Sequence, residues 1–154
     1  MTTSERSTGV SRSRAGAGND LLRLYLQDIG RVNLLSNEEE VLLARQVQRR
    51  EQLLRQEREL AEAHPILRRL LELEELQQRE ANHHCHWPTR QEWARAAGMS
   101  VAELQTILNE GYGTWSRLID LEPRTLKAQL RDGRRARDRM IAANLRLLVA
   151  VARK

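Results

Sequence analysis

The densest run of side chains that could bind a metal is His83, His84, Cys85 and His86. Imidazole and thiolate groups ligate zinc, but four consecutive residues cannot easily turn all their side chains toward one ion. Outside this run the chain offers only His64 as a further ligand of this kind, whereas zinc sites usually pair ligands from two segments. The sequence therefore favours a polar loop here, and we expect no metal.

No group of residues indicates catalysis. The chain has no glycine-rich phosphate loop, and no Ser or Cys has a plausible base close to it. Its many Glu residues alternate with Arg, as they do on the solvated faces of helices. We interpret the chain as a binding protein that is not an enzyme and needs no cofactor.

The composition predicts an all-α fold. The 154 residues include 31% charged residues, three Trp, two Tyr and no Phe, which leaves little bulky material for a deep core. Leu, Ala, Arg, Glu and Gln dominate, and all of them favour helix. One Cys, no signal peptide and no apolar run long enough to span a membrane indicate a cytoplasmic chain.

The spacing of apolar residues and capping motifs predicts helical hairpins behind a disordered tail. A first helix would begin at Asp20 as N-cap and end at Gly30 in a left-handed conformation. A second would begin near Asn37, after a capping box of Ser36 and Glu39, and break at His64-Pro65. We expect four segments: a disordered tail (1–19), a helical segment (20–62), a helical insertion (63–123) and a basic helix (124–154).

Within the insertion, two capping boxes flank a glycine. Thr89 with Glu92 and Ser100 with Glu103 would begin two helices, with Gly98 in the turn between them. The third helix would run to about Ala81, with a loop after it. The spacing around Gly98 is that of a helix-turn-helix. The second helix presents these side chains: Ser100, Ala102, Glu103, Gln105, Thr106 and Asn109. Without a cation among them, a structural hairpin is favoured over DNA reading.

Positive charge is concentrated near the C-terminus. The net charge of the chain is +5, yet residues 124–154 carry 10 Lys or Arg against two Asp. Such a segment suits a phosphate backbone or an acidic protein surface, and a solvated helix face is an equally good explanation.

Two segments carry a resemblance to a known family. DLLRLYLQDIGRVNLLSNEEEVLLARQV (20–47) resembles the segment that opens the structured part of primary-type bacterial RNA polymerase sigma factors. RRARDRMIAANLRLLVAVARK (134–154) is similar to the start of the sigma domain that binds core polymerase, and PTRQEWARAAGMSVAEL (88–104) to the insertion of cyanobacterial and plastid members. The pieces occur in the family's order over about residues 19–154.

The resemblance implies roles for individual residues. Four positions would face the non-template strand of promoter DNA just downstream of the minus-ten element: Arg23, Tyr25, Leu26 and Gln27. Four others would lie in the helix that docks on the clamp of the largest subunit of the polymerase core: Asn144, Leu145, Arg146 and Leu147. An Arg and a Tyr on a short exposed helix can pair with a phosphate and stack on an unpaired base. Tyr25 could instead fill a small core with Leu22 and Ile29.

The resemblance implies the N-terminal portion of a sigma factor, which takes part in transcription initiation by binding. The chain lacks the family's aromatic row for the minus-ten element, and Lys154 falls within an unfinished helix. Two alternatives remain open: a stand-alone helix-turn-helix regulator acting through residues 89–110, and a structural or decoy helical protein that occupies polymerase.

Overall fold

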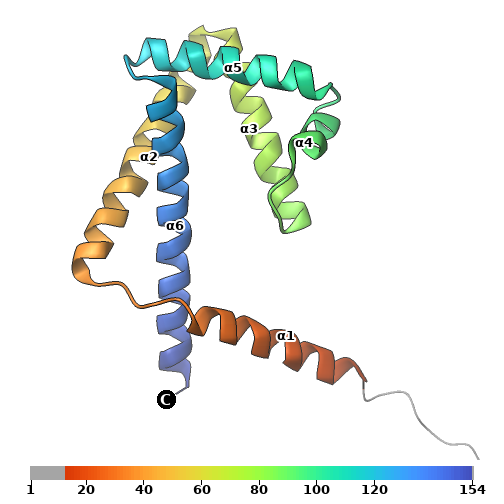
Figure 1. Ribbon diagram of the computed structural model, residues 1–154, viewed down its shortest axis with the longest axis vertical. Coiled ribbons are helices and arrows are strands. Elements are labelled where there is room, and N and C mark those ends of the chain that lie inside the picture. Colours follow the sequence, from red (N-terminus) through yellow and green to blue (C-terminus); the bar gives the residue numbers. More distant parts are fainter. Residues whose placement is uncertain (1–12, 154) are drawn as a thin grey trace, which may run out of the picture. The chain divides into compact units, whose positions relative to one another are not determined.

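A computed structural model describes the backbone of residues 13–153 and, from Asp20 onward, every side chain in that range except that of Ile29. Within this range the fold is all-α, as predicted, and no strand is present. The helices are α1 (Ser13–Gly30), α2 (Asn37–Ala63), α3 (Pro65–His84), α4 (Arg90–Ala96), α5 (Val101–Leu118) and α6 (Pro123–Ala152), labelled in Figure 1.

The predicted start of the first helix is wrong, whereas its predicted end at Gly30 is confirmed in position but not in conformation. Of the tail predicted for residues 1–19, residues 1–12 lie outside the described range, and α1 already begins at Ser13, so that Asp20 lies inside the helix. No proline interrupts this stretch, and its alanines favour helix. Gly30 is not left-handed, because the helix includes it and closes with a bond of 3.2 Å from the Arg31 N–H to the Asp28 carbonyl.

The three predicted capping boxes are confirmed. At the start of α2, the Ser36 N–H donates to Glu39 Oε2 at 2.8 Å, and the Glu39 N–H donates to Ser36 Oγ at 3.2 Å. Thr89 with Glu92 and Ser100 with Glu103 make the same reciprocal bonds at the starts of α4 and α5. Each box satisfies two backbone donors that a helix start otherwise leaves open.

The predicted breaks near His64 and Gly98 are also confirmed. His64 is extended, and Pro65 occupies the first turn of α3, where its missing N–H costs nothing. Gly98 has a φ of +69°, which an L side chain rarely adopts, and it reverses the chain between α4 and α5. The loop predicted after Ala81 starts later, because α3 continues to His84 and ends at Cys85, which is left-handed with a φ of 58°.

The chain divides into two compact units, and α2 and α6 contribute to both. One unit combines Met1–Val41 with Arg137–Lys154, and the other comprises Leu42–Ala136. The second unit contains the main hydrophobic core, whose buried members are Leu53, Ala61, Leu67, Leu70, Leu73, Trp93, Ala94, Leu104, Leu108, Trp115 and Leu126.

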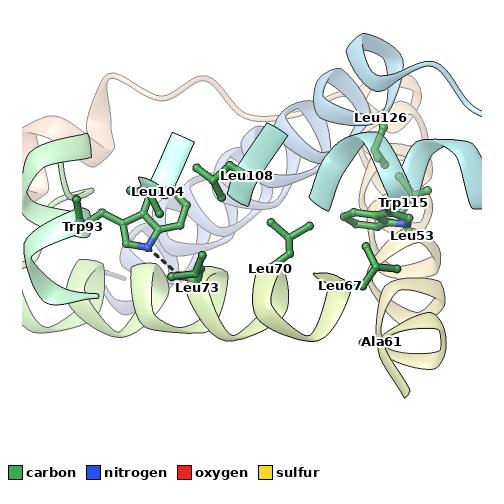
Figure 2. Packing of buried hydrophobic residues seen from close by; sticks show 11 residues of the cluster. Leu53, Ala61, Leu67, Leu70, Leu73, Trp93, Leu104, Leu108, Trp115 and Leu126 are labelled. Carbon is green, nitrogen blue, oxygen red and sulfur yellow. Dashed lines mark hydrogen bonds between the residues drawn. The ribbon is translucent and has the colours of Figure 1, made fainter. Parts of the chain in front are cut away.

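Leucines of α3 pack against α5 and α4 in this core, as Figure 2 shows. Gly111 permits the close approach of α5, since a Cβ there would lie 3.1 Å from the Cβ of Leu70. The Trp93 indole N–H donates to the Leu73 carbonyl at 2.9 Å, so this buried aromatic also satisfies its polar atom. These contacts fix the short helix α4 onto α3.

Candidate functional site

The α1 side chains that we expected to contact DNA are largely exposed. Tyr25 is 49% exposed and Leu22 55% exposed, so Tyr25 is not the centre of a small core. Arg23 and Gln27 are also exposed, and Leu26 is half-buried. This helix therefore presents a cation and an aromatic ring to solvent, the two groups that unpaired nucleic acid requires.

Several of these residues line a hollow in the same unit. Its lining comes from α1 and from the residue that follows α6: Asp20, Leu22, Arg23, Leu26, Gln27 and Arg153. Two of the six side chains are basic and one is acidic, so the hollow offers positive charge beside apolar surface. Such a surface can hold a phosphate group next to a base or sugar. Tyr25 is not among the lining residues, which places the aromatic ring beside the hollow instead of inside it.

The four α6 residues that we expected to bind polymerase differ in exposure. Leu147 is 53% exposed, and Asn144 is exposed as well, whereas Leu145 is half-buried. The Arg146 guanidinium is committed within the chain, because its Nη1 donates to the Val32 carbonyl in the loop between α1 and α2. The structure therefore ties this loop to α6 through Arg146.

The second half of α6 exposes further apolar side chains besides the four residues that we expected to bind polymerase. Leu148 and Val151 are each 64% exposed, and Ile141 is 45% exposed. Apolar side chains of this size gather at protein interaction surfaces more often than on free helices. Leu148 and Val151 belong to the apolar run Leu145 to Val151, which the sequence predicts to need a partner, whereas Ile141 lies outside that run.

Electrostatic contacts connect the start of α2 with α6 within this unit. The Arg139 Nη2 lies 3.9 Å from Glu39 Oε1. The pKa of Glu39 is lowered, first because its carboxylate accepts the Ser36 backbone N–H and further because Arg139 is near. An exposed pair at this distance contributes little stability. The pair places a cation of α6 next to the capping box that starts α2.

The helix-turn-helix pair forms as predicted, but its second helix is poorly suited to read DNA. On α5, Gln105 Nε2 donates to Asn109 Oδ1 at 2.8 Å, and the Thr106 hydroxyl donates to the Ala102 carbonyl at 2.9 Å. The polar groups that would contact bases are thus bonded to their own helix, and Glu103 adds negative charge. The arrangement matches a structural hairpin better than a recognition helix.

The His83–His86 segment forms the end of α3 and the loop that follows. His84 Nε2 lies 3.4 Å from Glu80 Oε2, and the His83 and His84 rings meet edge to face at 4.7 Å. Among residues 13–153 no group of His, Cys, Asp and Glu is arranged to hold a metal ion. None of the helices in this range is long and apolar enough to cross a membrane.

Sequence reasoning missed a buried polar cluster in the unit Leu42–Ala136. The Tyr112 hydroxyl donates to Glu74 Oε1, and Glu57, which is 0% exposed, lies beside them without a hydrogen-bond donor among the described residues. Burial, and then the neighbouring Glu74 carboxylate, raises the pKa of Glu57 to about 9. Burial also raises the pKa of Glu74 and of Tyr112. The available signal was that Glu74 continues the apolar spacing of α3.

Comparison with known proteins relates the chain to transcription factors. The family described as sigma-70 factor, region 1.2, matches residues 20–53, which include most of α1 and the first half of α2. Over 147 residues the chain is 37% identical to the RNA polymerase sigma-C factor of Nostoc sp., covering 95% of this chain and 35% of that protein. It is 36% identical to RNA polymerase sigma factor SigA2 of Synechococcus elongatus over 94% of this chain and 32% of the relative.

A probable RNA polymerase sigma-C factor of Synechocystis sp. is 37% identical over 88% of this chain and 33% of its own length. The chain thus spans about a third of the length of the curated relatives that it matches. No solved structure matches it significantly. The expected resemblance is confirmed: residues 20–53 match the family described as sigma-70 factor, region 1.2. Beyond that segment, nearly the whole chain is similar to the cyanobacterial sigma factors named here.

Proposed function

We propose that the chain acts in transcription initiation as a sigma-factor segment that binds promoter DNA and the RNA polymerase core. It does so by binding and not by catalysis. The observation that carries the proposal is the match of residues 20–53 to sigma-70 region 1.2, together with the exposure of Arg23 and Tyr25 on the helix that opens this match.

On α1, the proposed partner is the single non-template strand just downstream of the minus-ten element. Arg23 would pair with a backbone phosphate, and Tyr25 would stack on an unpaired base, an interaction of about 1 to 3 kcal/mol per base. Leu26 and Gln27, which line the hollow, would contact the same strand. Arg153 lines that hollow too and would add a second cation for the strand.

On α6, the proposed partner is the clamp of the largest subunit of the polymerase core. The exposed Leu147 and Asn144 would contact it directly, and the exposed Leu148 and Val151 would extend the apolar surface. The half-buried Leu145 would support this face. Arg146 would act indirectly by holding the loop at Val32, and through it the end of α1, against α6.

A binding assay tests the polymerase contact. The chain, fluorescently labelled at the exposed Cys85, is titrated with core polymerase from a cyanobacterium, and binding is followed by anisotropy. We expect saturable binding that Leu147→Glu weakens at least about tenfold, since a charge would be desolvated in the interface. Leu118→Glu, at a comparably exposed leucine in the other unit, is the matched control. Equal affinities for both variants and the parent chain would contradict the α6 assignment.

A further inference from the structure

A cleft of about 500 Å³ lies in the unit Leu42–Ala136, apart from the residues assigned to promoter and polymerase. Side chains of α2, α3, α5 and α6 line it, together with Arg90 of α4 and Trp87 of the preceding loop. Its basic lining residues come from three helices and are Arg50, Arg58, Arg90, Lys127, Arg131 and Arg134. Nothing in the proposed function accounts for so many cations around one recess.

The charge of this cleft favours an anionic ligand. Six basic side chains line it against three carboxyl groups, those of Glu57, Glu74 and Glu75. Two of the cations also have acidic neighbours, because Arg50 pairs with Glu51 at 3.7 Å and Arg131 with Asp132 at 3.2 Å. The buried Glu57 carboxyl is protonated near neutral pH because of its raised pKa of about 9, so it offsets none of this charge. Cations gathered in a recess with low-dielectric walls repel one another and produce a strong local positive potential. An anion that enters the cleft would relieve this repulsion.

The cleft also offers flat surfaces. The Arg134 guanidinium carbon lies 4.4 Å from the centre of the Trp87 ring, and Trp87 is 43% exposed. Lys127 Nζ lies 5.1 Å from the centre of the Tyr112 ring. Nucleobases stack on aromatic rings and on guanidinium planes, and nearby cations contribute to this binding. The Tyr112 ring is already stacked against Trp115, so the exposed Trp87 ring is the surface that a base would use and an inorganic anion would not.

Other side chains that line the cleft can recognise the polar edges of a base. Glu74 holds the Tyr112 hydroxyl on one oxygen and lines the recess together with Gln77 and Gln105. Carboxylate and amide oxygens accept hydrogen bonds from the exocyclic amino groups of bases. The carboxyl groups of an acidic peptide could not donate hydrogen bonds to the carboxyl oxygens of Glu74 in this way. A duplex is read by elements that project into its grooves, and a recess does not do so.

From the charge, the flat surfaces and the size of the cleft, we propose that it binds a nucleoside phosphate. The phosphates would lie among Lys127, Arg131 and Arg134 on α6. The base would stack on Trp87, with its polar edge toward the Glu74 carboxyl group. A volume of about 500 Å³ is within the range of small-molecule sites, roughly 300 to 1,000 Å³. The ligand can be a free nucleotide or one nucleotide of a single strand, because both present the same base and phosphate.

Calorimetric titration of the full chain tests the proposal. The probes are the four nucleoside triphosphates, a short single-stranded oligodeoxynucleotide, and tripolyphosphate as an anion without a base. We expect at least one base-bearing probe to bind about tenfold more tightly than tripolyphosphate. Tighter binding of the triphosphate than of the oligonucleotide would assign the site to free nucleotides, and the reverse to a strand; either outcome supports the proposal.

Variants distinguish this cleft from the rest of the basic surface. Arg134→Gln removes a guanidinium that faces Trp87, and Arg131→Gln removes an exposed guanidinium. Because Arg131 is exposed, its replacement should not disturb folding, which circular dichroism would verify. Each should weaken nucleotide binding about tenfold, whereas Arg95→Gln, exposed on α4 and outside the cleft, should leave it unchanged. Equal binding of tripolyphosphate and nucleotides, no binding at millimolar concentration, or insensitivity to both variants would overturn the proposal.

Discussion

Replacing the buried Glu57 by Gln should stabilise the protein at neutral pH but not in mild acid. Glu57 is 0% exposed, neither of its oxygens has a hydrogen-bond donor among the described residues, and its pKa is raised from 4.5 to about 9. Burial is the main cause, and the Glu74 carboxylate adds to it, while Arg58 partly opposes it. The folded chain therefore keeps a proton that the unfolded chain releases.

The sign and the size of the effect follow from this difference. Between about pH 4.5 and 9 the folded state binds more protons at this site than the unfolded state, so the free energy of unfolding falls as pH rises. Each pH unit above 4.5 lowers the free energy of unfolding by about 1.4 kcal/mol. At about pH 7.5 the buried carboxyl therefore destabilises the folded chain by roughly 4 kcal/mol at most. Relaxation around the carboxyl and its coupling to Glu74 reduce this limit, so we expect a gain of about 1 to 4 kcal/mol for Glu57→Gln.

Urea unfolding followed by tryptophan fluorescence measures this gain, because the fully buried Trp115 reports on the same unit. The difference between Glu57→Gln and the parent chain should be small near pH 5 and should grow toward pH 7.5. Glu59→Gln, at an exposed carboxyl on the same helix, is the matched control and should give the same small difference at both pH values. A Glu57→Gln difference that does not change with pH would refute this account of the buried carboxyl.

Two further predictions concern packing and capping. Gly133→Ala should lower the free energy of unfolding by about 1 to 3 kcal/mol, because the new Cβ would lie 2.4 Å from Arg50 Cβ and 2.9 Å from the Gln46 carbonyl oxygen. Gly113→Ala, with nothing within 4 Å, should instead raise it by about 0.5 to 1 kcal/mol, and thermal unfolding compares the two. Ser100→Ala removes one half of a capping box and should cost about 1 kcal/mol in urea unfolding; an unchanged midpoint would argue against the cap.

Features set by neighbouring residues could be predicted from the sequence. Ser100 and Glu103 lie within one helical turn, so their pairing needs no tertiary contact, and the same holds for the left-handed Gly98 between two capped helices. Helix ends that depend on weak preferences were less predictable. A glycine can end a helix in a right-handed or a left-handed conformation. At Gly30 the bond from the Arg31 N–H to the Asp28 carbonyl closes the helix without a left-handed residue.

Features that join distant segments could not be derived from local patterns. The bond from Arg146 to the Val32 carbonyl connects residues that no spacing rule relates. The buried cluster of Glu57, Glu74 and Tyr112 likewise takes one residue from each of three helices. Polar residues on apolar stripes are a hint of such clusters. Their partners become visible only when the helices are placed.

Photocrosslinking from α1 tests the central claim most directly. A photoreactive phenylalanine analogue replaces Tyr25 in the full chain, which is mixed with core polymerase and a promoter scaffold melted around the minus-ten element, with each strand labelled separately. We predict crosslinks to the non-template strand just downstream of that element, which Arg23→Ala should weaken. The same probe at Gln105 on α5 should give few crosslinks to either strand. Crosslinks from position 105 but none from position 25 would contradict the account and favour the helix-turn-helix as the DNA-binding surface.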